Sequence, residues 1–68
     1  MSDQYRTPDS IQGKVLAVLP WEGGRTTGAI ARHASLSEDI VRRALEDLVR
    51  RGMVTIDNRN YWRKKPLD

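Results

Sequence analysis

The sequence predicts a small α+β domain in which three helices precede a β-hairpin. Residues 36–54, LSEDIVRRALEDLVRRGMV, join a capping serine, apolar residues at helical spacing, a glycine and a β-branched segment. Residues 53–64 then form two strand-like segments around the turn Asp-Asn-Arg-Asn. A chain of 68 residues has room for one domain. We assign that domain to residues 7–65, between a flexible tail at 1–6 and a short tail at 66–68.

The first helix is predicted to begin at Thr7, whose hydroxyl can cap it, with Pro8 at the first helical position. Asp9 suits the positive end of the helix dipole. One apolar stripe follows, formed by Ile11, Val15, Val18 and Leu19. Pro20 ends the helix because it has no N–H to donate.

A short second helix is expected after the loop at residues 21–24. Two glycines mark the loop, and Arg25 joins it to a very short strand. Thr26 or Thr27 can cap the helix. Its apolar residues are Ile30, Ala31 and Ala34. These small side chains allow close packing against neighbouring helices.

The third helix has the clearest ends in the sequence. Ser37 is its predicted cap, Leu36 before it can pack on Val41, and Gly52 is the expected left-handed terminator. The core stripe consists of Val41, Ala44, Leu45 and Leu48. Strands are predicted at 53–56 and 61–64. Trp21 and Trp62 are predicted to lie in the core or at its edge, because aromatic rings supply much of the burial in a small domain.

Composition limits the functions that the chain can have. The formal net charge is +3, which permits binding to a polyanion without demanding it. Cysteine is absent and there is one histidine, so neither disulfides nor a zinc site is expected. No nucleophile–base pair or phosphate-binding glycine loop is present, so we expect a non-enzyme without metal or cofactor. No membrane-spanning run is present, so we expect a soluble cytoplasmic protein, monomeric or weakly dimeric.

The segment 26–54, TTGAIARHASLSEDIVRRALEDLVRRGMV, resembles the helix-turn-helix of GntR-like and MarR-like bacterial regulators. The similarity rests on the Ile-Ala pair at 30–31, Leu-Ser at 36–37, Val-Arg-Arg-Ala-Leu at 41–45, Leu48 and Gly52. With the helices and hairpin around it, the resemblance covers roughly 7–65 and implies a small winged helix. It also implies double-stranded DNA binding, as a transcriptional regulator or as a phage or bacterial accessory factor.

In such families the third helix enters the major groove and the hairpin, or wing, reaches a neighbouring groove. Transferred by position, the DNA-binding residues are Arg25, Thr26, Thr27, Ser37, Asp39, Arg42, Arg43, Arg59, Arg63 and Lys64. Glu38 and Asp39 depart from the family pattern, which has neutral or basic residues there.

Two alternatives remain open from the sequence. The third-helix arginines can belong to a solvated face of i,i+4 ion pairs, namely Glu38–Arg42, Asp39–Arg43, Glu46–Arg50 and Asp47–Arg51. The domain can also be a protein-interaction winged helix that does not bind DNA. It would then use the mixed charge of this face, or an exposed Trp21 or Trp62.

Overall fold

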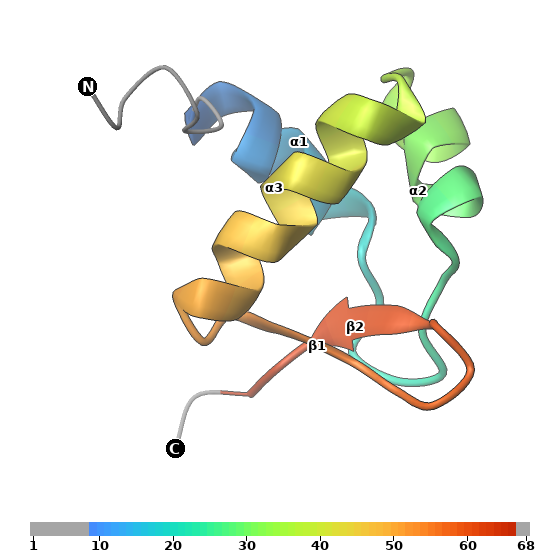
Figure 1. Cartoon of the computed structure of the whole chain (residues 1–68), viewed down its shortest axis with the longest axis vertical. Helices are drawn as coiled ribbons and strands as arrows, with labels where there is room; N and C mark the ends of the chain where they lie inside the picture. Colours follow the sequence, from blue (N-terminus) through green and yellow to red (C-terminus); the bar gives the residue numbers. More distant parts are fainter. Residues whose placement is uncertain (1–8, 67–68) are drawn as a thin grey trace.

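The computed structural model describes residues 9–66 and confirms the α+β fold, with three helices followed by an antiparallel hairpin (Figure 1). The elements are α1 (Asp9–Val18), α2 (Thr27–Ala34), α3 (Glu38–Arg50), β1 (Val54–Ile56) and β2 (Trp62–Lys64). This order is consistent with the layout of a winged helix. The predicted cap of α1 at Thr7, Pro8 and the tail at 1–6 lie outside the described residues.

The three helices pack against one another, and the hairpin lies at the end of α3 opposite its N-terminus (Figure 1). Their facing stripes form one apolar core with the hairpin. The buried apolar residues are Val15, Leu19, Ile30, Ala31, Val41, Ala44, Leu45, Leu48, Val54 and Trp62. All four residues of the predicted third-helix stripe are among them, so the helical period in the sequence identified the buried face correctly.

The ends of α3 are as predicted. Ser37 Oγ accepts a hydrogen bond from the Ile40 N–H at 3.3 Å. Gly52 has a φ of +75°, and the following Met53 N–H donates to the Leu48 carbonyl at 2.9 Å. This is the Schellman arrangement, in which a left-handed glycine lets the chain satisfy the last carbonyls of a helix. The reversal at Gly52 leads directly into β1.

The segment before α2 joins the hairpin. Arg25 and Trp62 exchange two backbone hydrogen bonds, at 2.8 and 2.7 Å, so an isolated β-bridge lies where a very short strand was expected. Thr26 is the cap of α2, and its hydroxyl accepts from the Ala29 N–H at 3.2 Å. The hairpin register pairs Val54 with Lys64. Each strand is one residue shorter than predicted.

Two predictions about burial were wrong. Trp21 is 60% exposed, whereas Trp62 is 8% exposed and belongs to the core. Trp21 follows Pro20, whose carbonyl accepts from the Lys64 N–H at 2.9 Å. The ring is therefore carried on a loop attached to β2 and lies outside the helical core. The second error concerns Asp47, which the ion-pair alternative placed on a solvated face but which is 9% exposed.

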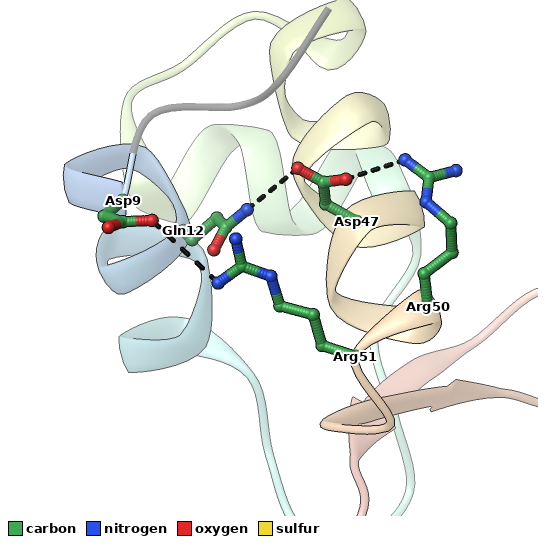
Figure 2. Close-up of polar contacts among 5 residues, drawn as sticks. All are labelled: Asp9, Gln12, Asp47, Arg50 and Arg51. Carbon is green, nitrogen blue, oxygen red and sulfur yellow. Dashed lines mark hydrogen bonds and ion pairs between the residues drawn. The ribbon is translucent and has the colours of Figure 1, made fainter. Parts of the chain in front are cut away.

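Asp47 lies on the flank of α3 that meets α1 (Figure 2). Its Oδ2 accepts from Gln12 Nε2 at 3.0 Å, and its Oδ1 accepts from Arg50 Nη2 at 2.7 Å. Arg51 instead reaches Asp9, with 3.9 Å between Nη1 and Oδ1. The predicted pairs Asp47–Arg51 and Glu46–Arg50 are therefore wrong. Arg50 thus pairs with the buried Asp47 at i,i+3 spacing instead of with Glu46 at the predicted i,i+4 spacing.

Candidate nucleic-acid interface

The outward face of α3 presents Arg42 and Arg43 to solvent. Within residues 9–66, no ion pair involves either guanidinium. The predicted pairs with Glu38 and Asp39 are therefore not formed, although Asp39 is exposed on the same helix. Both guanidinium groups keep their full set of donors available, which suits contact with phosphate oxygens or with guanine.

Glu38 faces the beginning of α2 rather than Arg42. A β-carbon placed on Gly28 would lie 3.6 Å from Glu38 Oε2. Gly28 is in the first turn of α2, where the helix dipole is positive, so a carboxylate is favourable there. The same carboxylate repels an incoming phosphate at this position. Glu38 therefore weakens the prediction that Thr26 and Thr27 bind phosphate.

The three predicted hydroxyl groups all support the scaffold. Thr26 and Ser37 accept from the backbone N–H of the third residue of their helices. Thr27 Oγ1 accepts from Trp62 Nε1 at 2.9 Å, which fixes the start of α2 against β2. Each hydroxyl still has a proton that it can donate. These residues thus position the face of the domain, and a ligand contact would be additional to that role.

Arg59 lies at the exposed tip of the hairpin, where the turn is well ordered by Asp57. Asp57 Oδ1 accepts from the Tyr61 N–H at 3.0 Å and from the Arg59 N–H at 2.9 Å. These bonds, chiefly the one from Tyr61, hold the pKa of the Asp57 carboxyl below its usual value of 3.8. The Arg59 guanidinium lies 5.4 Å from the Tyr61 ring centroid and 3.8 Å from Asp57 Oδ2. The turn therefore presents Arg59 on a fixed support.

The remaining basic candidates lie along the base of the hairpin. Arg63 is exposed on β2, and Arg25 is half-buried beside it through its pairing with Trp62. Lys64 Nζ lies 5.1 Å from the centroid of the Trp21 ring, a cation–π contact. Lys64 is therefore associated with Trp21, a partner that the sequence did not suggest.

The structure thus arranges the predicted residues in two groups. The helical group, on α3 and its cap, is Ser37, Asp39, Arg42 and Arg43. The hairpin group, which β2 and the start of α2 bring together, is Arg25, Thr26, Thr27, Arg59, Arg63 and Lys64. In the described part of the chain, no hydrogen bond or ion pair joins the two groups. They are linked indirectly through the first turn of α2, which contacts both β2 and Glu38.

Sequence reasoning missed the contact between Gln12 and Asp47. A signal for it exists, because Asp47 lies three residues after Ala44 and six after Val41, at the edge of the buried stripe. Gln12 similarly lies three residues before Val15 on α1. No comparable signal indicates the exposure of Trp21, which depends on the path of the loop after Pro20.

Comparison of the chain with protein-family models, with curated proteins and with solved structures gave no significant match. Residues 9–66 contain no group of three or more His, Cys, Asp or Glu side chains placed to bind a metal ion. No helix in this range is long and apolar enough to cross a membrane.

Proposed function

We propose that the protein binds double-stranded DNA, with α3 in the major groove and the tip of the hairpin against the adjacent backbone. The observation that carries the proposal is that the Arg42 and Arg43 side chains are exposed and available to a ligand. Both are exposed on the outward face of α3, and no ion pair within residues 9–66 occupies them. Arginine donates in pairs to guanine O6 and N7 and to phosphate oxygens, so two such side chains one position apart suit a groove surface.

The rigid hairpin tip supports the same function. Arg59 projects from a turn that Asp57 fixes through two backbone hydrogen bonds. A preordered turn loses less conformational freedom on binding than a flexible one. Winged helices use this element beside the recognition helix, which makes the relative placement of Arg59 and α3 consistent with DNA binding.

The test compares duplex binding of the wild type with that of the double variant Arg42→Ala, Arg43→Ala. Fluorescence anisotropy with a labelled random-sequence duplex is measured between about 50 and 200 mM salt, the range in which phosphate contacts change affinity strongly. Each lost phosphate contact lowers the slope of log K against log salt by about 0.9. We expect a slope reduced by about 2 and an affinity at least tenfold weaker.

Lys14→Ala is the matched control, because Lys14 is an exposed cation on α1 rather than on α3. We expect this variant to keep nearly the wild-type affinity. Circular dichroism establishes that each variant retains its helices. If the double variant and Lys14→Ala bind the duplex equally, the outward face of α3 does not contact DNA and the proposal is rejected.

A further inference from the structure

Trp21 is the most exposed large apolar side chain among the described residues, at 60%. The other tryptophan of the chain, Trp62, is buried and bonded to Thr27, so the domain has core positions that accept such a ring. The duplex-binding proposal makes no use of Trp21. An exposed indole is frequent at protein-binding surfaces because its burial by a partner removes a large apolar area from water.

Trp21 forms one wall of a surface hollow, which we call the Trp21 hollow. Its lining residues are Leu16, Trp21, Met53, Lys64 and Lys65. Leu16 is half-buried against the core and Met53 is 37% exposed, so both add apolar surface to the ring. Lys64 and Lys65 complete the lining, and the aliphatic stems of lysine side chains can pack on apolar surface. The lining therefore combines apolar surface with two cations.

The charge around the ring is strongly one-sided. A second depression on Trp21 is lined by Arg63, Lys64 and Lys65 together with Glu22. Three cations and a single acid thus surround the indole in the described structure. Lys64 Nζ is already 5.1 Å from the ring centroid, which keeps positive charge directly beside the apolar surface. A ligand that complements this surface must combine negative charge with an apolar group.

Backbone hydrogen bonds fix the walls of the hollow. The Lys64 N–H donates to the Pro20 carbonyl at 2.9 Å, which attaches the Trp21 loop to β2. The Lys65 N–H donates to the Met53 carbonyl at 3.0 Å, which extends the pairing of the hairpin by one residue beyond Val54 and Lys64. The hollow therefore exists before a ligand arrives, and binding does not require the backbone to be ordered first.

We propose that the Trp21 hollow docks an acidic segment of a partner protein, which inserts one apolar side chain beside Trp21 while its carboxylates pair with Lys64, Lys65 and Arg63. The apolar wall made by Leu16 and Met53 favours this occupant over a stacked nucleobase. A base would cover the face of the ring and leave these two aliphatic side chains uncovered. The proposal concerns a different surface from the outward face of α3 and from Arg59, which carry the duplex-binding proposal. It shares Arg63 and Lys64 with the hairpin group.

The test uses a labelled synthetic peptide of Asp and Glu residues with a central Leu-Phe pair. A second peptide, in which two serines replace that pair, retains the charge without the apolar group. Fluorescence anisotropy measures binding, and the emission of Trp21 reports burial of the indole, with buried Trp62 as a constant background. We expect the Leu-Phe peptide to bind about tenfold more tightly than the serine peptide and to shift the emission to shorter wavelength.

Trp21→Ala removes the ring and should weaken the Leu-Phe peptide about tenfold, whereas Val49→Ala should change binding less than twofold. Val49 is the matched control because it is 40% exposed on α3 and does not line the hollow. The double variant Lys64→Gln, Lys65→Gln should reduce the salt dependence of peptide binding. Trp21→Ala should leave duplex affinity unchanged, so failure of one proposal is distinguishable from failure of the other.

Three results would overturn the assignment. Equal binding of the two peptides would show that charge alone attracts them. Equal binding by Trp21→Ala and the wild type would place the peptide elsewhere. Binding of oligo(dT) that is tighter than peptide binding and is lost in Trp21→Ala would assign the surface to single-stranded nucleic acid instead.

Discussion

Replacement of Gly24 by alanine should detach the segment before α2 from the hairpin. Gly24 has a φ of +82°, and a β-carbon there would lie 2.7 Å from Tyr61 Cβ and 3.2 Å from the Trp62 carbonyl oxygen. Both neighbours belong to the hairpin, and Trp62 is part of the core. The contact is too short for a methyl group, so the backbone has to move. The two hydrogen bonds between Arg25 and Trp62 are the first that such a movement would break.

Gly23, the residue before Gly24, provides a matched comparison from which the destabilisation by Gly24→Ala can be worked out. Gly23 has nearly the same φ, +80°, but a β-carbon there would meet nothing within 4 Å. A left-handed backbone costs an alanine about 1–2 kcal/mol, and this cost applies to both variants. Gly24→Ala adds the cost of overpacking, about 1–3 kcal/mol. The loss of the two backbone hydrogen bonds between Arg25 and Trp62, at about 1 kcal/mol each, gives a cost of the same size. The difference between the two variants should therefore be about 1–3 kcal/mol.

Urea and thermal unfolding, followed by circular dichroism, measure this difference. In a domain of this size 1 kcal/mol lowers Tm by about 4–8 °C, so the two variants should be clearly separated. Gly23→Ala should be the milder of the two, with a destabilisation set by backbone strain alone. Equal destabilisation of the two variants would refute the close approach of Gly24 to Tyr61. A neutral Gly23→Ala would refute the left-handed conformation of the loop.

Three other perturbations test separate features. Asp47→Ala removes the acceptor of Gln12 and should lower the free energy of unfolding by about 1–3 kcal/mol in urea titrations. The control Glu46→Ala, at an exposed acid one residue earlier, should change it by less than about 0.5 kcal/mol, and similar losses would contradict the buried contact. The lowered pKa of Asp57 means that its carboxylate stabilises the fold above its ordinary pKa of 3.8 and loses this effect as pH falls through the lowered value. The stability advantage of the wild type over Asp57→Ala, measured by thermal unfolding, should therefore shrink below that pH, and a constant advantage would argue against ionised Asp57 as its source. Glu38→Gln should tighten duplex binding about 2- to 5-fold in anisotropy titrations by removing negative charge beside α2, and an unchanged affinity would show that no phosphate approaches there.

The sequence was most informative where the signal is local. The left-handed conformation that terminates α3 indicates a glycine, which the sequence supplies at Gly52, and the Asp-Asn-Arg-Asn turn is where the hairpin reverses. The cap at Ser37 depends on a hydroxyl that accepts from the N–H of Ile40, three residues later. These interactions span a few residues, so their chemistry is visible in a short stretch of sequence. The candidate residues on α3 could be predicted for the same reason, since helical period determines which side chains face outward.

Long-range contacts decided the rest. Ion pairs predicted along α3 were replaced where α1 approaches, because Gln12 and Asp47 meet across 35 positions of sequence. Spacing within one helix cannot reveal such a partner. Lys64 likewise became a neighbour of Trp21, a residue far from it in sequence, because the Pro20 carbonyl binds its backbone. The surface available to a ligand therefore differs from the one that charge patterns alone suggest.

By itself, the sequence determined three helices, a hairpin, the buried stripe of α3 and the arginines on its outer side, because caps, turns and periodicity act over one or two helical turns. Only the tertiary structure decided which tryptophan is buried. Trp62 bonds to Thr27, again across 35 positions, and belongs to the apolar core. Trp21 is left at the surface beside Lys64. Two identical side chains thus have different environments, because burial depends on which distant segments meet around them.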